Sequence, residues 1–148
     1  MKKLTILFRT VVAASALVLL TVAAHAEVVK FHATLKTAWE VPAKEGPGHG
    51  KLTATYDTDS MLFTYHVEYS DLSGPAVAAH FHGPATETTT GKPQIFVKVS
   101  PISSPIDGSA TLTPEQAKDL IGGSYYFNIH TAANPGGEVR GQVLKDKY

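Results

Sequence analysis

The sequence predicts an all-β fold, an antiparallel Greek-key sandwich or barrel of about eight short strands with one short helix. Segments in which apolar and polar side chains alternate recur along the chain, and clusters of Gly, Pro, Asp, Asn and Ser separate them. Only one segment carries the start and stop signals of a helix. The 12 glycines in 148 residues fit a fold that needs many tight turns.

The first three predicted strands lie between clear turn signals. The third shows the cleanest alternation, with Phe63, Tyr65 and Val67 on one face and Thr64 and His66 on the other. A Gly- and Pro-rich stretch separates the first two strands, and an Asp- and Ser-rich stretch separates the second from the third. We expect these strands at residues 28–35, 51–56 and 61–69.

A fourth strand carries His80 and His82 and ends at Gly83-Pro84, because proline cannot donate a hydrogen bond to a sheet. The helix begins after Thr113, which has the N-cap position, with proline at the first helical position and Gln116 three residues after the cap. It ends at Gly122. The other strands are expected at residues 94–100, 109–112, 124–130 and 138–145, and residues 101–107 are expected to be irregular.

Residues 1–26 have the pattern of an export signal. Lys2, Lys3 and Arg9 form a basic start, an apolar run covers residues 11–24, and Ala24-His25-Ala26 fits a cleavage site. The run is short for a membrane span, and an uncleaved anchor is the alternative. We therefore expect an exported protein, periplasmic or extracellular, with one domain at residues 27–148 and no membrane span after cleavage.

The composition excludes several classes of function. Without residues 1–26, 10 basic and 13 acidic residues remain, and no basic stripe is present that would indicate a nucleic-acid partner. The chain has no cysteine, so a bound metal must be held by nitrogen and oxygen atoms. The motifs of serine hydrolases, zinc proteases and P-loop proteins are absent. The sequence therefore does not point to an enzyme of these classes, and it leaves a protein partner unidentified.

His80 and His82 are candidate metal ligands. Residues two apart on a strand point to the same side, with Cβ atoms roughly 7 Å apart. His130 lies on a later strand-like run, before the turn signal Asn134-Pro135-Gly136-Gly137. Three neutral imidazoles suit Cu(II) or Zn(II), and the Irving–Williams order favours copper. The alternative is that the histidines only satisfy hydrogen bonds in a sheet.

Three further residues are possible accessory groups at such a site. His66 and Glu138 carry ligand atoms, although the strand pattern does not place them, and His66 also fits a solvated strand face. Arg140 is the only arginine after residue 26, and an ion pair with Glu138 is its alternative role.

Six segments, in order, span nearly all of the chain after residue 26. They are residues 31–35 (FHATL), 40–42 (EVP), 78–85 (AAHFHGPA), 112–120 (with Leu112-Thr113 and Leu120), 126–131 (YFNIHT) and 134–142 (NPGGEVRGQ). Together they resemble the CHRD domain, a module named after chordin and found in many secreted microbial proteins. Ala43 stands where that family often has a second proline.

The strand with His80 and His82, the later His130 and the Gly-rich turn before Arg140 are also similar to copper–zinc superoxide dismutases. That resemblance implies that the three histidines are copper ligands and that Arg140 lies near the copper. The chain has no bridging histidine in the loop after Gly83 and no cysteine pair, so the resemblance does not extend to a zinc subsite.

Two functions from different classes follow. In the first, the protein binds copper, or zinc, for storage, delivery or redox protection. In the second, it is an extracellular interaction module with structural histidines. Convergence of the three histidine side chains in the fold favours the first, and exposure of Trp39, Phe81 or Tyr125 favours the second.

Overall fold

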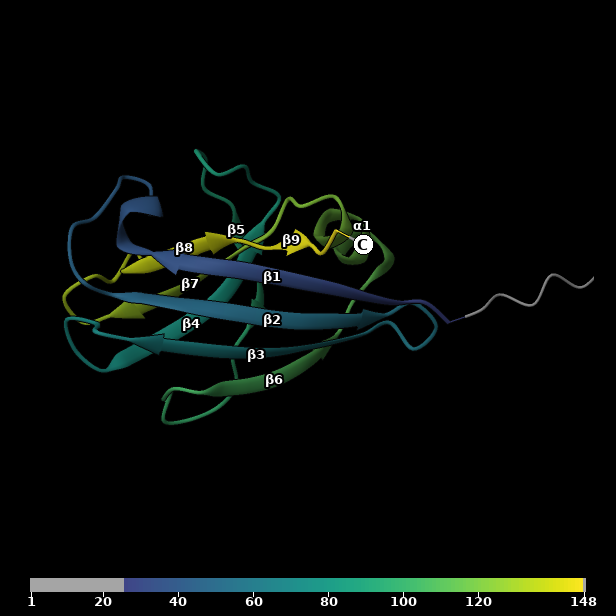
Figure 1. Ribbon diagram of the computed structural model, residues 1–148, viewed down its shortest axis with the longest axis horizontal. Coiled ribbons are helices and arrows are strands. Elements are labelled where there is room, and N and C mark those ends of the chain that lie inside the picture. Colours follow the sequence, from purple (N-terminus) through teal and green to yellow (C-terminus); the bar gives the residue numbers. More distant parts are fainter. Residues whose placement is uncertain (1–25, 148) are drawn as a thin grey trace, which may run out of the picture.

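A computed structural model describes residues 26–147, which form nine strands, one short 3-10 helix and one α-helix (Figure 1). The strands are β1 (Val28–Lys36), β2 (His49–Asp57), β3 (Leu62–Ser70), β4 (Ala76–Gly83), β5 (Lys92–Phe96), β6 (Ile106–Thr111), β7 (Tyr126–Thr131), β8 (Val139–Gln142) and β9 (Leu144–Lys145). The 3-10 helix is η1 (Thr37–Trp39), and the α-helix is α1 (Pro114–Ile121). The predicted all-β fold with a single short helix is confirmed.

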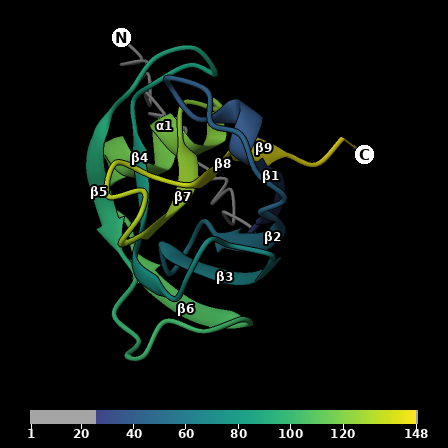
Figure 2. The same ribbon diagram turned by 90° about the vertical axis from the view of Figure 1, so that its left-hand side faces the viewer.

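The strands form one antiparallel sheet in the order β5-β4-β7-β8-β1-β2-β3-β6, and β9 pairs with β1. The sheet curls so that β1, β2, β3 and β6 face β4, β5, β7 and β8, which gives a nearly closed sandwich (Figures 1 and 2). The two layers meet where Lys36 of β1 pairs with Arg140 of β8. Consecutive strands β3 and β4 therefore lie in different layers, and β4 pairs with β7 from much later in the chain.

Alternation of apolar and polar residues decides which side of each strand is buried. Every second residue of β1 is buried and the others are exposed, as a strand with one solvated face requires. Phe63 of β3 and Phe81 of β4 meet in the core with ring centroids 5.2 Å apart, and Phe81 also contacts Phe127 of β7 at 4.7 Å. Because Phe81 and Phe127 point inward, their neighbours in sequence point to the outer face of β4 and β7.

Helix α1 begins as its sequence predicts. The Thr113 side chain accepts a hydrogen bond from the Gln116 backbone, and the Gln116 side chain accepts one from the Thr113 backbone, which completes a capping box. Ala117 and Leu120 are its buried residues. They attach the helix to the core and leave its polar face to solvent.

Three predicted strands differ from the structure in number or by more than two residues at one end. The segment predicted as one strand at 138–145 is divided into β8 and β9, because the buried Val143 bonds to the Tyr125 carbonyl instead of continuing the ladder. Strand β5 is shifted toward the N-terminus relative to 94–100, and β6 begins inside the segment expected to be irregular. The predicted export signal falls outside the described residues except for Ala26. Within residues 26–147, none of the helices has the length and apolar character needed to span a membrane.

Candidate metal centre

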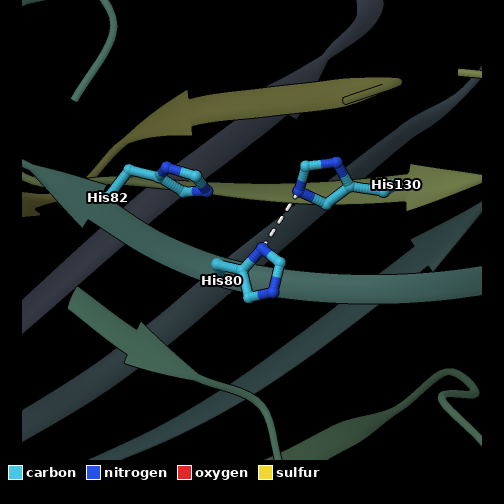
Figure 3. A group of neighbouring side chains, drawn as sticks. All are labelled: His80, His82 and His130. Carbon is cyan, nitrogen blue, oxygen red and sulfur yellow. Dashed lines mark hydrogen bonds between the residues drawn. The ribbon is translucent and has the colours of Figure 1, made fainter. Parts of the chain in front are cut away.

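Three histidines from two neighbouring strands meet on the outer face of the sheet. His80 and His82 come from β4, and His130 comes from β7 (Figure 3). Each offers one ring nitrogen, and these nitrogen atoms all lie within 4.8 Å of one another. Within residues 26–147 this is the one group of three or more His, Asp or Glu side chains close enough to share an ion. The structure therefore brings together the three residues that the sequence singled out.

The pairing of β4 with β7 produces this convergence. His130 lies opposite Ala78, and His82 lies opposite Tyr126, so His130 is placed diagonally from His80 across the ladder. The small side chain of Ala78 leaves the space above it to the imidazoles. Strand alternation and register alone are thus sufficient to bring the three rings together.

Backbone carbonyl groups fix the orientation of two of the three rings. Nδ1 of His82 lies 3.0 Å from the Gly91 carbonyl oxygen, and Nδ1 of His130 lies 2.9 Å from the Pro135 carbonyl oxygen. A carbonyl oxygen can only accept, so both Nδ1 atoms carry the proton, and both Nε2 atoms present a lone pair. Metal-binding histidines are commonly held in this way by a hydrogen bond from the second ring nitrogen.

His80 completes the cluster from the more exposed side. Its Nδ1 lies 3.1 Å from Nε2 of His130, as the dashed line in Figure 3 shows, and donates to it because that atom is an acceptor. The ring of Phe96 packs edge-on against His80, with centroids 4.9 Å apart. His82 and His130 are buried, and His80 is half-buried, so the approach to the cluster runs past His80.

The surroundings favour the neutral form of His80 and His82. Burial, together with the nearby His130 and His82, lowers the pKa of His80 to about 4. Burial also lowers the pKa of His82, although its hydrogen bond to Gly91 opposes this effect. Neutral imidazole is the form that binds metal. Nε2 of His82 is buried without a hydrogen-bond partner, and an unpartnered buried lone pair of this kind suits a bound cation.

Arg140 lies beside the cluster and supports it indirectly. Its Cζ is 3.5 Å from the ring centroid of Tyr126, and His82 stacks on the same ring at 4.9 Å with an interplanar angle of 8°. Its Nη2 donates to the carbonyl oxygens of Thr86 and Thr89, each at 2.8 Å. Because Gly91 belongs to the same loop, Arg140 helps to hold the carbonyl group that orients His82.

The structure does not bring Glu138 or His66 to the cluster. Both carboxylate oxygens of Glu138 accept hydrogen bonds, which come from Ser73, Thr131 and Asn134. Burial raises the pKa of Glu138, but these hydrogen bonds outweigh burial and leave it below its usual value. Glu138 thus anchors the turn before β8, and this bonding, rather than an ion pair with Arg140, occupies its carboxylate.

His66 lies on β3 in the opposite layer. Its Nδ1 is 2.7 Å from Asp107 Oδ1, and its side chain is 44% exposed. His66 therefore lies on a solvated strand face, which was the alternative prediction for this residue.

Sequence reasoning missed the residues that orient the histidines. Gly91 and Pro135 act through backbone carbonyl groups, which carry no side-chain signal. Tyr126 and Asn128 stand four and two residues before His130 on the same strand, so strand alternation could have placed them on the outer face beside it.

The fold and the site together define a class of protein, namely an antiparallel β-sandwich with three histidines on its outer face. The CHRD domain family model matches residues 31–143, which is most of the chain and includes all three histidines. The chain belongs to the CHRD domain family. Searches of curated proteins and of solved structures found no match. CHRD domains are typically found in extracellular or secreted proteins, and this agrees with the expected export.

Proposed function

We propose that this exported CHRD-domain protein binds one divalent metal ion through His80, His82 and His130, with copper preferred over zinc. The observation that carries the proposal is the convergence of three ring nitrogens within 4.8 Å. The carbonyl hydrogen bonds at Nδ1 of His82 and His130 leave Nε2 of each ring as the atom with the lone pair, and that of His82 has no partner. A set of neutral imidazoles with fixed orientation loses little entropy when an ion binds.

The donor set supports a divalent ion of borderline softness. Imidazole nitrogen suits copper and zinc, and copper binds more tightly to the same ligands under the Irving–Williams order. Three protein ligands leave at least one coordination position for water or another ligand. The role that follows is metal storage, delivery or redox protection, and the proposal includes no catalytic step.

Copper and zinc titrations of the chain from Glu27 onward test this proposal. Wild type should bind one equivalent of Cu(II), and His80→Ala and His130→Ala should weaken binding by at least about 10–100-fold, the range seen even for lost supporting contacts. His66→Ala is the matched control, because His66 also bonds to a neighbour but lies in the other layer. Wild-type binding no tighter than that of His80→Ala and His130→Ala would show that the histidines are structural.

An extracellular interaction module is the second candidate function. Trp39 is 45% exposed, which favours this function, whereas Phe81 and Tyr125 are fully buried and do not support it. Trp39 borders a cavity of about 680 Å³ between η1, β1 and β8. If the titration finds no metal binding, this surface is the place to look for a partner.

A further inference from the structure

Asn128 lies beside the histidine cluster on β7. It lies on β7 between Tyr126 and His130 on the outer face, and its Cα partner across the ladder is His80. Its side chain is buried, with 2% of its surface exposed. The amide is therefore enclosed on the same side of the sheet as the three imidazoles.

The nitrogen of this amide lies near Gly137 and the carboxyl group of Glu40. A Cβ atom added to Gly137 would lie 2.6 Å from Nδ2 of Asn128 and 2.5 Å from Oε1 of Glu40, so both atoms border the space above this glycine. A carboxyl group beside an amide is best satisfied by the N–H group. Oε1 of Glu40 is itself buried without a hydrogen-bond partner, and Nδ2 of Asn128 is the donor that borders the same space.

The oxygen of the amide belongs to the same outer face as His82, whose partner across the ladder is Tyr126, two residues before Asn128. Oδ1 of Asn128 is buried and has no hydrogen-bond partner, and the same is true of Nε2 of His82. Since the Gly91 carbonyl fixes the proton of His82 on Nδ1, both buried atoms are acceptors with no donor between them. A cation satisfies two such acceptors at once.

We propose that Oδ1 of Asn128 is a fourth ligand, which makes the site a set of three nitrogens and one oxygen, with Glu40 as the residue that positions the amide. This inference rests on the proposed metal-binding function. An oxygen ligand would also make the site selective for the oxidation state of copper. Amide oxygen is a hard ligand that suits divalent ions, whereas Cu(I) prefers soft sulfur ligands. The site should hold Cu(II) in preference to Cu(I).

Two substitutions of Asn128 test the proposal, and they differ in whether the side chain keeps an oxygen atom. Asn128→Leu has a similar volume and no donor atom, whereas Asn128→Asp keeps an oxygen in the same place. Asn128→Leu should weaken Cu(II) binding at least about tenfold and alter the copper electron paramagnetic resonance spectrum. It should change Cu(I) affinity less. Asn128→Asp should bind Cu(II) at least as tightly as wild type.

A spectroscopic readout separates a ligand from a residue that only supports the fold. Glu40→Leu removes the acceptor that holds Nδ2 and should shift the Cu(II) spectrum toward that of Asn128→Leu, and Glu40→Gln should keep the wild-type spectrum. Wild-type affinity and spectrum in Asn128→Leu would overturn the fourth ligand while leaving the three histidines in place. An Asn128→Asp variant with weakened Cu(II) binding would also overturn it. Absence of binding in wild type would overturn both proposals.

Discussion

The guanidinium group of Arg140 lies over the ring of Tyr126, with Cζ 3.5 Å from the ring centroid. Tyr126 is on β7, and the strands on its two sides supply Arg140 from β8 and His82 from β4. Arg140 thus contacts Tyr126, and Tyr126 contacts His82, so the three side chains form one stack across three strands. Arg140 therefore acts on the histidine cluster through this stack, through the loop that its Nη2 holds, and through its charge, which adds to burial in lowering the pKa of His82.

Arg140→Lys should therefore weaken both stability and metal binding. Lysine lacks the planar group that stacks on Tyr126 and bonds to Thr86 and Thr89 together. We expect the free energy of unfolding to fall by about 2–4 kcal/mol and Cu(II) affinity to fall about tenfold. Denaturant unfolding and copper titration measure these changes.

Lys36→Ala is the control for this substitution. Lys36 Nζ also lies over an aromatic ring, that of Trp39 at 4.9 Å, but the pair is exposed. Loss of this contact should lower the free energy of unfolding by less than about 1 kcal/mol. Equal effects of the two substitutions would contradict a special role for Arg140.

Gly137 and Gly136 should respond differently to alanine. Gly137 has a φ of +123°, and a Cβ there would meet the side chains of Glu40 and Asn128 at 2.5 and 2.6 Å. Gly137→Ala should lower the free energy of unfolding by about 1–3 kcal/mol or more. At Gly136 an added Cβ would meet nothing within 4 Å, so Gly136→Ala should stay within about 0.5 kcal/mol of wild type. Thermal unfolding of both variants compares them directly, and equal melting temperatures would rule out the predicted clash.

Glu40 should make the protein less stable as the pH rises toward neutrality. Burial raises the pKa of Glu40 to about 7, although Arg140, Asn128, the Val41 backbone and Lys44 oppose this. The value in the unfolded chain is near 4.5, so between these two values the folded state holds more protons. The free energy of unfolding should therefore fall through this window as the pH increases.

Glu40→Gln should remove this dependence, because glutamine does not titrate. The difference in unfolding free energy between the variant and wild type should grow between pH 4.5 and 7, to roughly 3 kcal/mol in favour of the variant. Urea unfolding at a series of pH values gives this difference. A constant difference across the window would mean that Glu40 has an ordinary pKa.

Export should leave Glu27 as the first residue. The prediction comes from the basic start, the apolar run and the Ala24-His25-Ala26 site. Mass spectrometry of the native protein checks it. Recovery of chains that retain Met1 in the cytoplasm would contradict it.

The sequence was sufficient to predict the strands and the outward direction of the histidine pair, because both depend on local alternation. The positions of Phe81 between His80 and His82, and of Ile129 beside His130, already assign the two sides of β4 and β7. The capping box of α1 is equally local. Predictions of this kind need no knowledge of which strands pair.

Contacts that depend on long-range pairing could not be predicted. His66 carries the same side chain as His80, but the pairing of β3 with β2 and β6 places it in the other layer. Glu40 follows a 3-10 helix with no pattern that indicates burial, and its position beside Asn128 and Gly137 depends on the meeting of β1 and β8 at Lys36 and Arg140. The resemblance to the dismutases implied that Arg140 lies near the copper, and it did not indicate that Tyr126 contacts both Arg140 and His82.

The two edge strands of the sheet are β5 and β6, and neither has features that favour pairing with another strand. Strand β5 is five residues long, begins with Lys92 and Pro93, and pairs with β4 through a bulge. Strand β6 presents Asp107, Ser109 and Thr111 as its exposed residues. Charge, proline, irregular pairing and short length are the features by which sheet proteins prevent edge-to-edge aggregation. A sandwich that stays open between these two strands is therefore protected from pairing edge to edge with a second copy.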